Sequence, residues 1–315
     1  MTIFVNMDIN KDYTTQTINL KPDYEGEVTA TLIASKANVG NRKSVLYLHG
    51  FVDYFFHAHL GEEFNTNDYD FYALDLRKYG RSLLEHQHPN YCRHIEEYFE
   101  EISIAIRQLY ETGKGKEVFL LAHSTGGLTA SNYMNYGQEK DLVKGLLLNS
   151  PFLDFNQSNF EKVMIPIIAK PIAGLFPYAK IEGVLSPAYV ESIHKNYYGE
   201  WNFNLAWKPV KGFPTYFKWV LAIQEAQNKL KQSDIKVPIL VMHSDASSRL
   251  KRYSEETKHQ DIVLDINDIK RVGSKLGNQV TLLEVKNGVY DLFLSTQIVR
   301  EKAFRKMFDW LKALE

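Results

Sequence analysis

The stretch Leu120-Leu121-Ala122-His123-Ser124-Thr125-Gly126-Gly127 decides the fold of this sequence. It continues an apolar run typical of a buried strand, and it opens a segment that can form a helix. Small residues around Ser124 relieve crowding at a tight turn, which would lift the Ser124 hydroxyl above the edge of the sheet and place the Thr125 amide at a helix N-terminus. We therefore predict that Ser124 is a nucleophile and the Thr125 amide an oxyanion donor. A serine that only caps the helix would show the same local pattern.

Other segments predict the fold around this turn. Residues 27–34 alternate apolar and polar positions, as antiparallel strands with one solvated face do. Apolar runs further along indicate central parallel strands covered on both faces by helices. These runs are residues 45–48, 71–74, 118–121, 146–148 and 239–242. Helical spacing of apolar residues is clearest at Ile95, Tyr98, Phe99, Ile102, Ile106 and Leu109, and at Ile298, Phe304, Met307, Phe308 and Leu311. The fold class is therefore α/β.

Two further loops follow predicted strands. In Val45-Leu46-Tyr47-Leu48-His49-Gly50-Phe51 the predicted strand ends in His-Gly. Glycine lets the backbone turn there, so the next amide, that of Phe51, can supply a second oxyanion donor. Leu74-Asp75-Leu76-Arg77-Lys78-Tyr79-Gly80-Arg81-Ser82 runs from a strand into a polar loop. Each could be an ordinary strand-to-helix turn, but their order and spacing before Ser124 favour a joint role.

Residues 155–230 interrupt the alternation of strands and helices. No strand-like run occurs there, six prolines divide the segment, and it is rich in aromatic residues. Long insertions of this kind are usually functional, so we predict an inserted helical cap over residues 155–230 above a core formed by residues 1–154 and 231–315. A locally packed excursion between two strands is the alternative.

These motifs, in this order over nearly the whole chain, resemble the α/β-hydrolase superfamily. Within it the sequence is similar to the serine-aminopeptidase, lysophospholipase and monoglyceride-lipase-like branch. The resemblance implies an α/β-hydrolase fold with a mostly parallel central sheet, antiparallel N-terminal strands and flanking helices. It also implies a catalytic triad in the order serine, acid, histidine.

The resemblance places the acid at Asp261, in Asp261-Ile262-Val263-Leu264, with Asp265 and Asp245 as weaker candidates. Asp265 could instead cap a helix beginning near Ile266. The histidine position is occupied by Tyr290, in Asn287-Gly288-Val289-Tyr290-Asp291-Leu292. A phenol with a pKa near 10 is a poor general base at neutral pH.

Three explanations of Tyr290 compete: a relative that lost hydrolysis and kept its pocket, a substitution in this sequence, or another group replacing the base. His259 is the nearest sequence candidate for that group. His49 and His123 are expected to hydrogen-bond the local backbone. The other histidines lack the spacing of a zinc-binding helix, and we predict no metal and no cofactor.

Composition narrows the class of protein. With 37 basic and 38 acidic side chains in 315 residues, charge gives no reason to expect nucleic acid or an anionic membrane as a partner. No basic leader or long apolar run is present, so we predict a cytoplasmic protein without integral membrane association. Cys92, the single cysteine, is expected to be a surface or half-buried thiol.

The favoured hypothesis is a serine hydrolase, resembling carboxylesterases and lysophospholipases, that cleaves an ester or acyl bond of a small, partly apolar substrate. Ser124 would attack, the Phe51 and Thr125 amides would hold the oxyanion, and Asp261 would orient residue 290. The rival is a non-catalytic small-molecule-binding protein that uses the same pocket, which Tyr290 motivates. Peptidase action on N-terminal residues rests only on family analogy.

Overall fold

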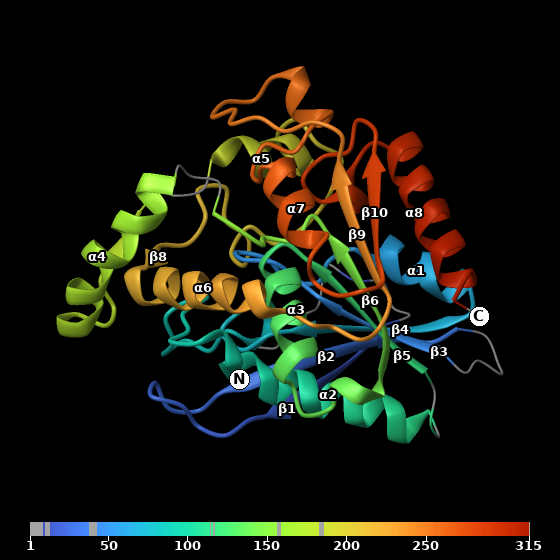
Figure 1. The fold of residues 1–315 in the computed structure, drawn as a ribbon, viewed down its shortest axis with the longest axis horizontal. Helices are drawn as coiled ribbons and strands as arrows, with labels where there is room; N and C mark the ends of the chain where they lie inside the picture. The colour runs from blue at the N-terminus through green and yellow to red at the C-terminus, as the bar shows by residue number, and fades with distance from the viewer. Residues whose placement is uncertain are drawn as a thin grey trace.

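A computed structural model of the chain describes residue 9 and residues 13–37, 43–113, 115, 117–155, 159–182 and 186–314. Its centre is an eight-stranded sheet in the order β1-β2-β4-β3-β5-β6-β9-β10 (Figure 1). β1 and β2 are antiparallel to each other and β2 is antiparallel to β4, whereas all pairs from β4 to β10 are parallel. The strands are β1 (Thr14–Asn19), β2 (Thr29–Ser35), β3 (Lys43–Leu48), β4 (Tyr69–Asp75), β5 (Glu117–His123), β6 (Val143–Asn149), β9 (Ile239–Ser244) and β10 (Val280–Val285).

The predicted apolar runs are the buried centres of β3, β4, β5, β6 and β9. Their neighbours in the sheet cover both edges and their helices cover both faces, so no position on them needs to be polar. The alternating segment 27–34 contributes β2, which pairs antiparallel with β1 as predicted. The α/β fold with antiparallel N-terminal strands is confirmed, and its arrangement is that of an α/β-hydrolase.

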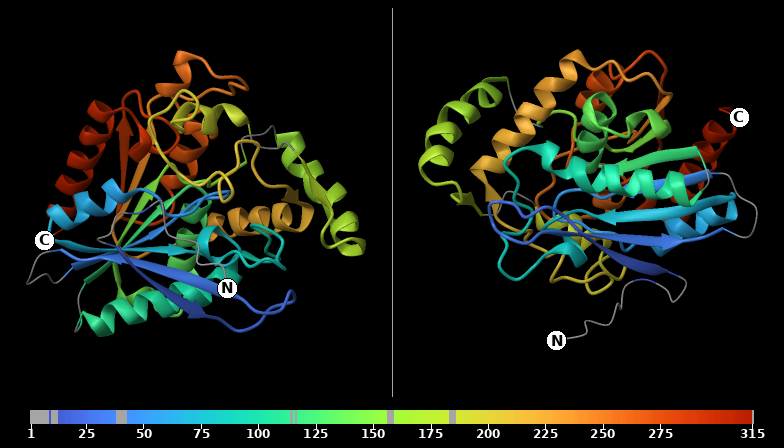
Figure 2. Two further views of the ribbon diagram at one scale, coloured as in Figure 1. Left: turned by 180° about the vertical axis from the view of Figure 1, so that it is seen from behind. Right: turned by 90° about the horizontal axis from the view of Figure 1, so that it is seen from below.

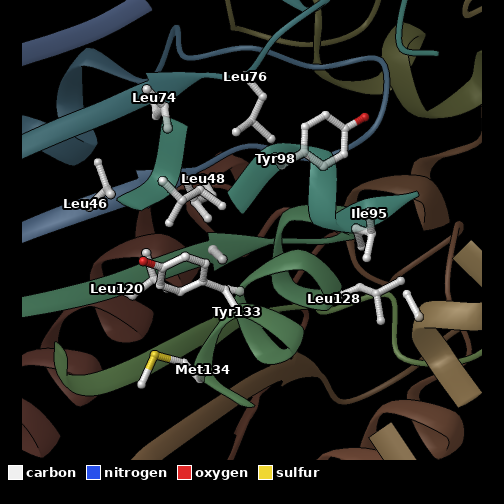
Figure 3. Packing of buried hydrophobic residues seen from close by; sticks show 14 of the residues in the cluster. Leu46, Leu48, Leu74, Leu76, Ile95, Tyr98, Leu120, Leu128, Tyr133 and Met134 are labelled. Carbon is white, nitrogen blue, oxygen red and sulfur yellow. The ribbon is translucent and has the colours of Figure 1, made fainter. Parts of the chain in front are cut away.

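Helices pack on both faces of the sheet. On one face α1 (Ala58–Thr66) and α8 (Gln297–Lys312) lie side by side, and their Phe64 and Phe308 rings are 5.0 Å apart (Figure 2, left). On the other face are α2 (Phe99–Thr112), α3 (Thr125–Tyr136) and α7 (Ile266–Gly273). Figure 3 shows this second core, in which leucines of β3, β4 and β5 meet side chains of α3. The sheet is therefore covered by helices on both faces.

Two predictions about individual side chains were wrong. Ile298 is 69% exposed, and its neighbour Val299 packs into the core in its place, whereas the other predicted positions, Phe304, Met307, Phe308 and Leu311, are buried as expected. Cys92 is fully buried beside Tyr98, and burial raises the pKa of its thiol to about 12. The predicted stripe from Ile95 to Leu109 is confirmed, with its first turn a 3-10 helix at Ile95–Tyr98.

The described residues of segment 155–230 form the α-helices α4 (Asn159–Leu175), α5 (Pro187–Ile193) and α6 (Phe217–Lys229). Figure 1 shows α4 beyond the edge of the main body, against α6. Two short antiparallel strands that the sequence did not predict, β7 (Lys180–Ile181) and β8 (Thr215–Tyr216), join its two halves. Each is two residues long, which is too short to leave a periodic pattern.

Gly126 lets α3 approach β3, and we expect Gly126→Ala to destabilise the fold. An added Cβ would lie 2.4 Å from the His49 carbonyl oxygen and 2.7 Å from that of Leu48, both backbone atoms of the sheet. Overpacking of this kind costs about 1–3 kcal/mol, and the fixed backbone places this case at the upper end. Urea unfolding measures the loss.

Gly174→Ala is the control, because nothing lies within 4 Å of its added Cβ and alanine favours a helix by up to about 1 kcal/mol. Equal effects of the two substitutions would contradict the prediction.

Candidate active site

Ser124 occupies the sharp turn between β5 and α3. Its backbone has φ 55° and ψ −121°, a conformation that costs free energy in any residue other than glycine. The main chain holds it there: the Ser124 amide donates to the Asn149 carbonyl (3.1 Å), and the Ser124 carbonyl accepts from the amides of Gly127 (2.9 Å) and Phe152 (2.9 Å). These hydrogen bonds to β6 and to the first turn of α3 therefore offset the backbone strain at Ser124.

Two backbone amides lie at the same place. Gly50 packs directly against Ser124, since a Cβ on Gly50 would lie 3.4 Å from the Ser124 hydroxyl oxygen. The amide of the next residue, Phe51, and the amide of Thr125 have no hydrogen-bond acceptor within the described part of the chain. The Thr125 amide is also at the N-terminus of α3, where the helix dipole favours negative charge. Both amides are thus available to an oxygen anion.

Tyr290 follows β10 and reaches the serine. Its hydroxyl is hydrogen-bonded to the Ser124 hydroxyl, and its ring lies against the rings of His123 (4.7 Å) and Tyr189 (5.0 Å). Burial raises the pKa of the Tyr290 phenol well above its usual value, the Ser124 hydrogen bond opposes this, and the charge of Asp261 adds to it. The phenol is neutral at physiological pH and does not accept a proton from Ser124.

Asp261 is fully buried near Tyr290 but makes no hydrogen bond to it. Its Oδ1 accepts from the amides of Val263 and Leu264, both at 2.8 Å, whereas its buried Oδ2 has no partner. Burial raises the pKa of the carboxyl to about 7, against the effect of those two amides. The structure therefore brings Ser124 and Tyr290 together and leaves one oxygen of Asp261 unused.

A cavity of about 550 Å³ opens over Ser124. Ser124, Thr125, Phe51 and Tyr290 line it at the end of the sheet, and most of its remaining wall is apolar. Side chains of the 155–230 segment provide much of that wall, among them Ile165, Ile168, Ala169, Tyr189, Val190, Phe217 and Trp219. The Ser124 hydroxyl is thus at the wall of an apolar pocket of the size that small ligands occupy.

Residues 40–258 match the sequence profile of a family described as serine aminopeptidase, S33. The chain belongs to the S33 serine aminopeptidase family. The match includes Phe51, Ser124 and Thr125 and ends three residues before Asp261. A sequence comparison with curated proteins finds no match.

Solved structures share the fold of this S33 family member. A soluble variant of monoglyceride lipase from Saccharomyces cerevisiae, in complex with a substrate analogue, is 19% identical with a TM-score of 0.67 over 97% of both chains. The monoacylglycerol lipase of Paleococcus ferrophilus is 21% identical, with a TM-score of 0.66 over 90% of this chain and 99% of that one. A carboxyl esterase from Bacillus coagulans is 12% identical, with a TM-score of 0.66 over 95% and 98%. At these identities the likeness establishes the α/β-hydrolase fold.

The alternative acids of this S33 member have other partners. Asp265 caps α7 by accepting from the Asn267 amide (2.8 Å), which is the capping role predicted from the sequence as its alternative to catalysis. Asp245 accepts from the Asn287 amide (2.7 Å). His259 is exposed and does not line the cavity, so it is not placed to act on Ser124.

The predicted backbone contacts of two histidines are confirmed. His49 bonds through Nδ1 to the Gly50 carbonyl and accepts the Leu76 amide at Nε2, and His123 bonds through Nδ1 to the Asn149 carbonyl. Burial lowers the pKa of both rings, so both are neutral at pH 7.

Sequence reasoning missed two buried polar pairs beside the site. Asp291 is bonded to His57 Nε2 (2.9 Å) and to the Asn149 side-chain amide (2.7 Å). Asp53 is bonded to Lys208 Nζ at 2.6 Å, and both residues line the cavity. His57 and Asp291, like Asp53 and Lys208, are more than 150 residues apart in the chain. In the sequence, only two positions could have pointed to these pairs: Asp291 is next to Tyr290, and Asp53 is two residues after Phe51.

Other kinds of site are not seen in the described residues. No cluster of three or more histidine, cysteine, aspartate or glutamate side chains there could hold a metal ion. None of the helices in those ranges is both long enough and apolar enough to cross a bilayer.

The raised pKa of Asp261 predicts a pH-dependent stability. An unfolded aspartate has a pKa of about 3.9, whereas Asp261 in the fold has a pKa of about 7. Between these values the unfolded chain has released a proton that the folded chain keeps, so the contribution of Asp261 disfavours folding increasingly as pH rises from about 4 to about 7. Asparagine does not titrate. Relative to wild type, Asp261→Asn should therefore gain a few kcal/mol across this window, at about 1.4 kcal/mol per pKa unit. Urea unfolding at pH 4, 5, 6 and 7 measures the difference, and a constant difference would contradict the assignment.

Proposed function

We propose that this chain is a serine hydrolase scaffold that acts on an ester bond of a small, partly apolar substrate, and that Tyr290 limits its rate. The observation that carries the proposal is the Ser124 turn: a strained serine on the wall of an apolar cavity, next to two amides that have no acceptor in the described structure. A buried serine with only a capping role has no need of this arrangement.

In the proposed reaction Ser124 Oγ attacks the ester carbonyl carbon, and the carbonyl oxygen becomes an anion held by the Phe51 and Thr125 amides. The tetrahedral intermediate collapses, the alcohol leaves, and water then hydrolyses the acyl-serine. Attack requires a group that takes the serine proton. The neutral Tyr290 phenol cannot take it, so in this proposal the serine proton passes to water, and the leaving alcohol takes a proton from water. We therefore expect slow acylation and a preference for esters with good leaving groups.

Residues 155–230 act in this proposal as the cap that roofs the pocket. Their apolar side chains on the cavity wall support an acyl or other oily group in the substrate. Residues 1–154 and 231–315 form the core that holds Ser124, Asp261 and Tyr290. The monoglyceride and monoacylglycerol lipases and the carboxyl esterase with this fold are consistent with a lipid-like ester. We propose a cytoplasmic location.

A fluorophosphonate probe and p-nitrophenyl esters of short and long acyl chains test the proposal. Wild-type protein should be labelled at Ser124, and Ser124→Ala should lose both labelling and turnover. Turnover that is unchanged in Ser124→Ala would remove Ser124 from the reaction, and absence of labelling together with absence of turnover would count against a hydrolase.

The second candidate is a non-catalytic binding protein that uses the same cavity. The hydrogen bond between the Tyr290 and Ser124 hydroxyls favours it, because it occupies the nucleophile with a group that cannot activate it. Mass spectrometry of small molecules released from the purified protein separates the candidates. A bound amphiphile with no Ser124 labelling would support binding alone.

A further inference from the structure

The turn that carries the Phe51 amide is itself strained. Val52 has φ 51°, a left-handed conformation that is rare for a β-branched residue, and its side chain is buried. Residues held in such conformations persist only where their surroundings fix them. Val52 lies between Phe51 and Asp53, so the contacts of these two neighbours determine whether the turn keeps its shape.

Asp53 is fixed by a lysine from the 155–230 segment. Asp53 is 2% and Lys208 4% exposed, and Lys208 Nζ lies 2.6 Å from Asp53 Oδ1. Although burial acts to raise the pKa of Asp53, the charges of Lys208 and His57 outweigh it and lower the pKa, so the carboxylate stays ionised. In the described chain Asp53 is the one hydrogen-bond acceptor of the Lys208 ammonium.

The surroundings of Lys208 make this pair specific. The ammonium lies over the rings of Phe56 (5.5 Å), Tyr189 (5.7 Å) and Phe203 (5.8 Å), which direct the side chain towards Asp53. Buried ion pairs are often no more stabilising than apolar residues of the same volume. A gain in stability alone therefore does not account for two buried charges in a mostly apolar cavity wall.

The same segment holds the turn on its other side. The Phe51 ring stacks on Trp219 of α6, with 4.1 Å between centroids and 30° between planes. Trp219 and Lys208 both come from residues 155–230, and they contact the residues immediately before and after Val52. The strained turn is thus held from the 155–230 segment at two points, one apolar and one ionic.

We propose that Lys208 is a positioning residue: through its ion pair with Asp53 it holds the Val52 turn so that the Phe51 amide points at the oxyanion. This rests on the proposed function, in which that amide is a donor. Without the pair, Val52 relaxes to negative φ and the amide moves. A misplacement of about 1 Å in such a site can cost 100-fold in rate.

Kinetics in the Tyr290→His background test the proposal. Lys208→Met keeps an unbranched side chain, one heavy atom shorter, and removes its charge. It should lower kcat for a p-nitrophenyl ester about 10- to 100-fold, with KM changed less than about threefold. This is less than the about 100- to 1,000-fold that complete loss of one oxyanion donor costs, because the amide is displaced and not removed. Lys208→Arg retains the ion pair and should recover most of kcat.

Arg77→Met is the matched control. Arg77 forms a buried pair with Glu101 (2.6 Å) and does not line the cavity, so its loss removes a comparable interaction away from the turn. Urea unfolding compares the stability of all variants. A fall in kcat shared equally by Lys208→Met and Arg77→Met, or a Lys208→Met protein with unchanged kcat, would overturn the proposal.

A measurement without turnover keeps this test separate from the proposed function. In ¹⁵N-labelled wild-type background, Lys208→Met should shift the amide resonances of Phe51 and Val52, and Arg77→Met should leave them in place. If no variant hydrolyses esters but these resonances shift, the hydrolase proposal fails while the ion pair is shown to hold the turn. Unshifted Phe51 and Val52 resonances in folded Lys208→Met would overturn the positioning role whatever the activity.

Discussion

Tyr290→His is expected to raise kcat/KM for p-nitrophenyl esters by about 100- to 10,000-fold, the range that a positioned general base contributes. The phenol at this position already touches the Ser124 hydroxyl, so residue 290 is placed to receive the serine proton. What the wild-type residue lacks is basicity, since burial raises the pKa of the phenol well above its usual value. An imidazole is smaller than a phenol, and its ordinary pKa of about 6.5 suits proton transfer near neutral pH.

The matched control is Tyr290→Phe, which removes the hydroxyl and adds no base. It should leave the rate at or below the wild-type value. Ser124→Ala combined with Tyr290→His should return the protein to background, which shows that the gain passes through Ser124. If Tyr290→His is no faster than wild type while wild type is active and depends on Ser124, then another group removes the serine proton and Tyr290 does not limit the rate.

The local elements of this fold were predictable because their signals are local. The centres of β3, β4, β5, β6 and β9 are short apolar runs, and Ser124 lies in a strand–turn–helix pattern eight residues long. The phase of α8 was missed at Ile298, because a stripe at helical spacing does not fix which of two adjacent apolar residues faces the sheet.

The contacts of the site were less predictable, because they join distant parts of the chain. Tyr290 could be placed after the last strand from its motif, but its hydrogen bond to Ser124 spans 166 residues. The Asp53–Lys208 pair spans 155 residues and combines residue types that are usually solvated. Asp261 keeps one buried oxygen without a hydrogen-bond partner. This results from tertiary packing, which cannot be predicted from residue spacing in the sequence.

The unused oxygen of Asp261 leads to the second large effect, which appears only once residue 290 is a histidine. An imidazole needs an acceptor for the proton on its second nitrogen. Asp261 has a buried Oδ2 without a partner, and its charge already acts on the pKa of residue 290. A hydrogen bond from the imidazole would also lower the pKa of the Asp261 carboxyl from about 7, and the carboxylate would then be ionised at neutral pH. The aspartate would then fix the tautomer and stabilise the imidazolium that forms.

Asp261→Asn should therefore remove most of the gain in the Tyr290→His background, by about 100-fold or more, since loss of the acid in a serine protease triad costs about 10,000-fold in kcat. In wild type the same change should alter the rate less than about threefold, because no hydrogen bond joins Asp261 to Tyr290. The double-mutant cycle measures this coupling.

Asp265→Asn is the control: Asp265 caps α7, and asparagine caps a helix equally well. Equal losses from Asp261→Asn in both backgrounds, or a loss from Asp265→Asn as large as that from Asp261→Asn, would show that Asp261 acts through the fold and not through residue 290.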